Sequence, residues 1–177
     1  LPGSPLPSAS SSASSRSPRL AWLADFARLA LTVCLRLLDL GVALEAHGQN
    51  LLVVVDAAGR PVRLVYRDLA DIRISPARLA RHRVPAPPLT GRLLTDDPVA
   101  LRRKLFGSLV TGALGPAAGD AATLRTILDA ALRDVPPTQD LEALRSEALP
   151  AKALTLMRLG PGGADEWTLL PNPLGTG

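Results

Sequence analysis

Cysteine is almost absent from the sequence, since Cys34 is the only one among 177 residues. A single cysteine excludes an internal disulfide framework and fits a reducing compartment, so we expect a cytoplasmic location. Cys34 also falls on the apolar stripe of a predicted helix. We interpret it as a core residue and not as a nucleophile.

Aromatic residues are scarce as well, at 3% of the chain, while the formal net charge is +4. A basic chain can bind a polyanion, and basic residues cluster at 81–83 and at 102–104. Single-stranded nucleic acids are bound on aromatic stacking platforms, however, and aromatic residues do not interleave with these clusters. We therefore interpret both clusters as solvated surface and expect no nucleic-acid partner.

The chain also lacks a long hydrophobic run that is free of charge. Residues 20–44 are mostly apolar, but polar residues recur there at steps of three or four: Asp25, Arg28, Thr32, Arg36 and Asp39. This spacing keeps one face of a helix polar, so it predicts an amphipathic helix and no membrane span. Gly41 is a natural end for that helix, and we expect no membrane partner.

What the chain does have is enough apolar content for a core. Hydrophobic residues make up 47% of the sequence, which suits one ordinary domain. Residues 1–18 are the exception, because Ser, Pro and Gly dominate there without any apolar period. We predict a disordered tail or linker over 1–18 and a single domain over 19–177.

A β-hairpin is predicted after the first helix. The apolar runs LLVVVD and PVRLVYRD flank a short turn, in which Asp56 suits the first position of a type I turn and Gly59 the left-handed position. If Asp56 faces Arg60, then Asn50 faces Tyr66. In that register Asn50 and Asp68 project from the same side of the hairpin as diagonal neighbours.

Three helices and a second pair of strands are predicted further on. Helices are expected near 98–111, 120–134 and 139–148, the first with Asp97 as its N-cap. Residues 152–170 read as two strands around a Gly-rich turn. The fold class is therefore α+β, with a long amphipathic helix, then a hairpin, then a helical bundle.

Polar residues gather at one end of the predicted hairpin. Asn50 and Asp68 carry oxygen ligands of the kind that Mg²⁺ prefers and shares with substrate phosphates. His47 enters at the same end and can donate to a phosphate oxygen, while Gln49 falls on the other face of the strand. The alternative is a hairpin whose polar residues face water, and the pattern alone leaves both open.

The same residues carry a resemblance. EAHGQN, followed by strand, turn, strand and RD, together with LPAKALTLMRL and the terminal PNPL, resembles the C-terminal region of the NRPS-independent siderophore synthetases. This is the IucA/IucC family, labelled FhuF-like at this end. The resemblance extends over residues 20–174.

The resemblance implies a fold and an activity. Family members use ATP and Mg²⁺ to adenylate citrate or a related carboxylate, then pass the acyl group to an amine, hydroxylamine or alcohol. This chain would form most of the palm of their hand-shaped fold. By position, His47 would be catalytic and would meet the triphosphate, Asn50 and Asp68 would bind Mg²⁺, and Gln49 and Arg67 would belong to the nucleotide site.

Two departures from the family pattern accompany the resemblance. Residues 69–72 stand where many relatives carry glycines after RD. The family's upstream ATP motif and basic carboxylate pocket are not in this sequence, so we expect the N-terminal part of a synthetase as a partner. The alternative is a truncated, non-catalytic remnant that serves as a binding or oligomerisation module, with a homodimer as one form.

Two other functions fit less well. In a kinase-like phosphotransferase an Asp base would follow His47 and a Gly-rich phosphate loop would precede it, and neither is present. A ferric reductase, suggested by the FhuF label, needs a cysteine cluster for iron and sulfur. Lys152, in the LPAKAL block, we interpret as structural.

Overall fold

The computed structural model describes residues 17–89, 91–153 and 166–175. Its first element is helix α1 (Pro18–Leu40), whose N-cap Ser17 accepts a hydrogen bond from the amide of Leu20. The helix ends at Gly41, which adopts a φ of 110°. The amphipathic helix and its end are thus confirmed, although α1 starts inside the segment expected as a tail. No helix in the described ranges is long and apolar enough to cross a membrane.

Two short strands and a short helix, none of them predicted, surround the next segment. Strand β1 (Val42–Ala43) pairs antiparallel with β4 (Arg73–Ile74), and α2 (Pro76–Arg81) follows with Ser75 as its N-cap. Strands of two residues carry no alternation that a sequence can reveal. Their pairing matters because it brings the chain before His47 next to the chain after Asp68.

The hairpin is confirmed as β2 (Leu51–Val55) and β3 (Pro61–Tyr66), but its predicted register is wrong. The turn is as expected, with the amide of Asp56 donating to the carbonyl of Arg60. A β-bulge then shifts the pairing by one residue, so that Tyr66 faces Leu51 instead of Asn50.

The physical reason for the bulge is burial. With the shift, Leu51 faces Tyr66 and Val53 faces Leu64, and all four of these side chains are in or packed against the core. Without it, Val53 would face the charged Arg63. A one-residue slip exchanges the two faces of a strand, and burial therefore decides the register.

The three predicted helices are confirmed with shorter ends. They are α3 (Pro98–Leu109), α5 (Ala121–Ala131) and α6 (Gln139–Ser146), and Asp97 caps α3 as expected. Helix α3 runs into a π-helical segment, η2 (Val110–Leu114), and then α4 (Gly115–Ala118). A 3₁₀ turn, η1 (Gly91–Leu93), precedes α3.

The last predicted strands are confirmed in part. Strand β5 (Leu149–Lys152) begins three residues before the expected position and pairs antiparallel with β6 (Trp167–Leu170). The Gly-rich stretch between them lies outside the described residues.

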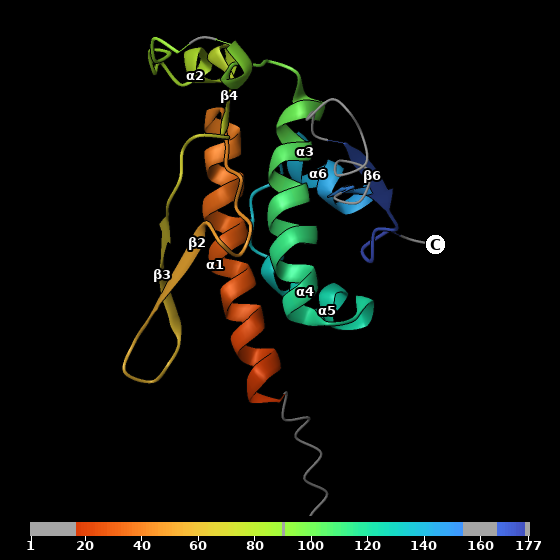
Figure 1. Cartoon of the computed structure of the whole chain (residues 1–177). Coiled ribbons are helices and arrows are strands. Elements are labelled where there is room, and N and C mark those ends of the chain that lie inside the picture. Colours follow the sequence, from red (N-terminus) through yellow and green to blue (C-terminus); the bar gives the residue numbers. More distant parts are fainter. Residues whose placement is uncertain (1–16, 90, 154–165, 176–177) are drawn as a thin grey trace, which may run out of the picture.

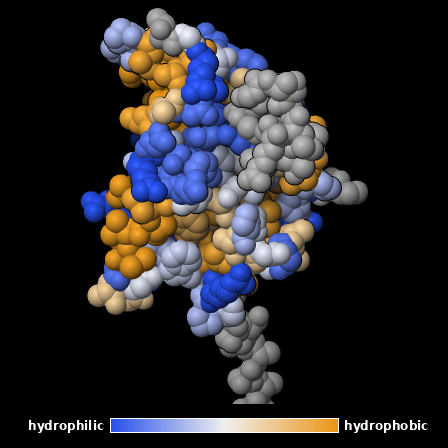
Figure 2. Space-filling view, viewed as in Figure 1, coloured by the Kyte–Doolittle hydropathy of each residue, from blue (hydrophilic) through white to orange (hydrophobic). Residues whose placement is uncertain are grey.

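The elements are arranged around α1 (Figure 1). The hairpin lies along one side of this helix, and α3 and α5 pack on the other side. Cys34 is buried in this core, as expected, and burial raises the pKa of its thiol to about 12. The outer face of the hairpin stays apolar, with Leu52, Val55, Val62 and Val65 exposed, and Figure 2 shows this hydrophobic surface. The fold is a mixture of helices and small sheets, as predicted.

Candidate functional site

The EAHGQN segment forms a compact loop between β1 and β2. The amides of Asn50 and Leu51 both donate to the carbonyl of His47, and the amide of His47 donates to the carbonyl of Glu45. Asn50 is buried, and its side-chain amide donates to that same Glu45 carbonyl at 3.1 Å. Asn50 therefore holds the loop closed, and its expected role as a metal ligand stays a prediction.

His47 is oriented by its own loop. Its Nδ1 accepts a hydrogen bond from the amide of Gln49 at 3.2 Å, so the neutral ring carries its proton on Nε2. Nε2 lies 3.9 Å from Oε2 of Glu45, and 30% of the His47 side chain is exposed. The imidazole is thus fixed in one tautomer, with an N–H group that can donate to a ligand oxygen.

Arg67 joins the end of the hairpin to this loop. Its backbone amide donates to the carbonyl of Asn50, and its Nε donates to the carbonyl of Gln49 at 2.9 Å. The corrected register explains this contact, since Arg67 and not Tyr66 lies opposite Asn50. The sequence analysis therefore correctly brought the EAHGQN loop and the RD end of the hairpin together, but it predicted Tyr66 instead of Arg67 opposite Asn50.

Asp68 leaves the strand with a left-handed backbone, at a φ of 71°. Its Oδ1 accepts a hydrogen bond from the amide of Ala70, and the residue is exposed. Among the hydrogen bonds between described residues, none joins Asp68 to Asn50. The sequence analysis expected the side chains of Asn50 and Asp68 to converge because it used the wrong hairpin register. Binding of Mg²⁺ by Asp68 stays a prediction.

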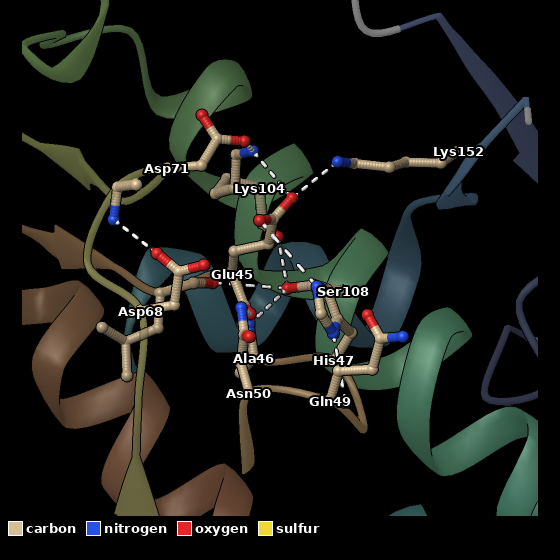
Figure 3. A network of polar contacts seen from close by, with 12 residues as sticks. Glu45, Ala46, His47, Gln49, Asn50, Asp68, Asp71, Lys104, Ser108 and Lys152 are labelled. Atoms are coloured by element: carbon tan, nitrogen blue, oxygen red, sulfur yellow. Dashed lines mark hydrogen bonds and ion pairs between the residues drawn. The ribbon is translucent and has the colours of Figure 1, made fainter. Parts of the chain in front are cut away.

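Next to the loop lies a network of charged side chains that the sequence analysis missed (Figure 3). Lys104 of α3 is only 2% exposed, and its Nζ lies 2.6 Å from Asp71 and 3.3 Å from Glu45. Lys152 of β5 reaches Glu45 from the other side, at 2.5 Å, and its Nζ lies 5.9 Å from the centre of the Trp167 ring. Glu45 thus connects the loop to both α3 and β5.

The solvated basic cluster predicted at 102–104 is wrong for two of its three members. Lys104 is buried, and Arg102 pairs with Asp140 of α6 at 2.8 Å. Arg78 of α2 binds the same carboxylate with both terminal nitrogens. A sequence signal for Lys104 did exist, because Leu101, Lys104, Leu105 and Ser108 share one helical stripe at i, i+3, i+4 and i+7.

A cavity of about 620 Å³ opens beside His47. Residues 47–49 line one wall, Lys152 and Ala151 another, and the α3–η2 helix a third, with small residues such as Gly107 and Gly112. The π-helical segment contributes Thr111, whose hydroxyl lies 2.8 Å from the carbonyls of Gly107 and Pro150. Two segments more than a hundred residues apart therefore meet at one cavity.

The donor set suits an anion better than a free metal ion. Among the described residues, no group of three or more His, Cys, Asp or Glu side chains could hold a metal. Lys152, whose ammonium group pairs with Glu45 at 2.5 Å, and the N–H of His47 are polar donors that line the cavity from β5 and from the loop. Mg²⁺ commonly binds through one or two carboxylates and takes its other ligands from phosphates and water. Asp68 offers an exposed carboxylate of this kind, but it is not among the residues that line the cavity.

Comparison with protein families gives one match. The family model described as "Ferric iron reductase FhuF-like transporter" matches residues 20–166, which include the EAHGQN loop, Asp68, Lys104 and Lys152. No curated protein matches the chain.

Several solved structures share the fold. The petrobactin biosynthesis protein AsbB from Bacillus anthracis str. Sterne is 21% identical with a TM-score of 0.69, and 87% of this chain aligns with 30% of that one. The aerobactin synthetase IucA from a hypervirulent Klebsiella pneumoniae is 20% identical with a TM-score of 0.68, over 89% of this chain and 31% of that one. IucC of the same pathotype is 20% identical, with a TM-score of 0.53, over 88% and 30%. The chain thus spans about a third of the length of each.

Proposed function

The chain belongs to the FhuF-like family, and on that ground we propose that it is the palm part of an ATP-dependent siderophore synthetase. The observation that carries the proposal is the cavity at which the EAHGQN loop and Lys152 meet. The likeness in fold to AsbB, IucA and IucC supports the proposal. So does the coverage, because nearly all of this chain aligns with about 30% of each of those chains, as expected for one part of a synthetase. The rest of such a synthetase is the proposed partner.

The proposed reaction has two steps. A carboxylate of citrate or a derivative is adenylated by ATP, with pyrophosphate as the leaving group, and the acyl group then passes to an amine, hydroxylamine or alcohol with release of AMP. A cytoplasmic location is part of the proposal, because the reaction consumes ATP. Homodimerisation stays a prediction.

The residues of this chain would act on the nucleotide. The Nε2–H of His47 donates to a phosphate oxygen, and Gln49 and Arg67 keep the loop in place through the 2.9 Å contact between Arg67 Nε and the Gln49 carbonyl. Asp68 would hold Mg²⁺ through its carboxylate, and the side-chain oxygen of Asn50 would be a second ligand. Bound Mg²⁺ would neutralise charge on the departing pyrophosphate. Donors that are already oriented cost no reorganisation when that charge develops.

A second candidate is a binding module of the same family that lacks turnover. The observation behind it is that neither Asn50 nor Asp68, the two expected metal ligands, lines the cavity at His47. Such a module would bind Mg·ATP without forming an adenylate. The reductase activity in the family description is not proposed, because the sole cysteine is buried with a pKa near 12.

The proposal is tested by titrating the chain with Mg·ATP in a calorimeter, beside His47→Ala and Asp68→Asn. We expect each substitution to weaken binding at least about tenfold, since one charge-assisted hydrogen bond contributes roughly 1.5–3 kcal/mol.

His82→Ala and Asp129→Asn are matched controls. His82 directly follows α2 and Asp129 lies on α5, and neither belongs to the EAHGQN loop, to the RD end of the hairpin or to the lining of the cavity at His47. Equal affinities for all five proteins would contradict the site. A folded wild type that binds no nucleotide would contradict the function.

A further inference from the structure

Lys104 is an unusual residue in this fold because it is charged and almost fully buried. It lies on α3 with 2% of its surface exposed, among core residues such as Leu101 and Leu105. A buried ammonium is costly unless it is paired, and among the described residues two carboxylates pair with it. They are Asp71 at 2.6 Å and Glu45 at 3.3 Å.

The two carboxylates belong to the two halves of the candidate site. Glu45 precedes His47 by two residues, and Asp71 follows Asp68 by three. One side chain from a third element, α3, therefore holds both segments, and Figure 3 shows Lys104 between the two acids. Ser108, one turn further along α3, adds a second contact, because its Oγ accepts from the amide of Ala46 at 2.9 Å.

We propose that Lys104 is a positioning residue that sets the separation between the His47 loop and the Asp68 segment. Its effect on nucleotide binding rests on the proposed function, in which His47 and Asp68 act on the same metal–phosphate group. Groups that act together must keep their geometry to within about 0.5 Å, and a rigid helix provides such support better than a loop. Lys104 has no contact with the ligand in this role.

A purely electrostatic role would give a different pattern of results. The ammonium of Lys104 could simply attract an anion, in which case Lys104→Met would weaken ATP binding and Asp71→Asn, which removes a negative charge, would strengthen it. Positioning predicts that both substitutions weaken binding, because each breaks the same bridge. The sign of the Asp71→Asn effect therefore separates the two roles.

The experiment compares wild type, Lys104→Met, Asp71→Asn and the control Arg103→Met, which removes an exposed charge at the preceding position of α3. Amide hydrogen exchange is measured without nucleotide, and affinity for Mg·ATP by calorimetry. We expect Lys104→Met to speed exchange at 46–51 and 69–72 but not in α1 or α5, and to weaken affinity at least about tenfold. We expect Asp71→Asn to weaken affinity several-fold and Arg103→Met less than twofold.

Tighter binding by Asp71→Asn, or unchanged exchange in both segments of Lys104→Met, would overturn the proposal. If Lys104→Met does not fold, Asp71→Asn decides it, because Asp71 is partly exposed and retains Arg73 as a partner. A wild type that binds no Mg·ATP would refute the proposed function, and the exchange data would still decide whether Lys104 holds the two segments together.

Discussion

At the residue scale, the site depends on ion pairs that bridge distant segments. Asp71 is the clearest example, because it receives Lys104 from α3 and Arg73 from β4. Burial raises the pKa of Asp71, but hydrogen bonds from Lys104 and Arg73 outweigh that effect and lower the pKa to about 2. The ionised carboxylate is therefore part of the folded state.

This pKa gives a prediction about acid stability. Because the folded pKa of about 2 lies below the ordinary value of 3.8, Asp71 stabilises the fold fully above about pH 4. That stabilisation is lost as the pH falls from 3.8 toward 2. The pKa of Asp140 is also held low, since its hydrogen bonds from Arg78 and Arg102 outweigh burial, so it acts in the same direction.

The check is the free energy of unfolding by urea, measured from pH 6 to pH 2 for wild type and Asp71→Asn. We expect the difference between the two proteins to shrink as the pH falls below 4. A difference that stays constant down to pH 2 would show that the Asp71 carboxylate is not ionised in these ion pairs.

Sequence patterns could identify the polar residues but not their partners. EAHGQN and RD marked His47, Gln49, Asn50, Arg67 and Asp68 from the sequence alone. Lys104 was not identified as a site residue because a run of three basic residues is usually solvated, and because its partners lie 33 and 59 residues away in the sequence. A buried ion pair is a tertiary feature, and only the helical stripe it shares with Leu101 and Leu105 hinted at it.

At the element scale, local signals predicted the helices and the hairpin. The period of apolar residues located α1, and Asp97 marked the start of α3. The hairpin register failed because turn chemistry sets only the first pair, whereas packing on α1 sets the rest. The pair β1–β4 joins segments far apart in the sequence, so local patterns give little information on it. The strands β5 and β6 flank a Gly-rich stretch, and that local pattern did predict them, with the first strand placed too late.

The end of α1 allows a test of this packing. A Cβ at Gly41 would lie 2.9 Å from both the Cβ of Arg78 and the carbonyl oxygen of Ser75, and the φ of 110° is also unfavourable for alanine. Gly59, at the hairpin turn, has a φ of 76° but nothing within 4 Å of the added Cβ. The two glycines therefore separate backbone strain from steric clash.

We expect Gly59→Ala to cost about 1 kcal/mol, from the left-handed backbone alone. Gly41→Ala should cost at least about 1 kcal/mol more, because overpacking displaces α2 from α1. Urea unfolding of both variants gives the comparison. Equal losses of stability would mean that α2 does not pack against the end of α1 as described.

At the scale of the whole molecule, the hairpin lies along one side of the helices and exposes an apolar surface (Figures 1 and 2). It spans about a third of the length of AsbB and IucA. The central claim is that this third contains a nucleotide site of its own at the cavity beside His47. We propose that adenylate formation needs the assembly with the proposed partner.

The chain has only two histidines, His47 and His82, so their imidazole signals give the most direct test of this claim. We would record ¹⁵N–¹H spectra of histidine-labelled chain during titration with Mg·ATP. The account predicts that the His47 signals move and saturate while those of His82 stay in place. If both histidines stay unchanged in a folded chain, or if both move together, the nucleotide does not bind at the His47 cavity and the claim is contradicted.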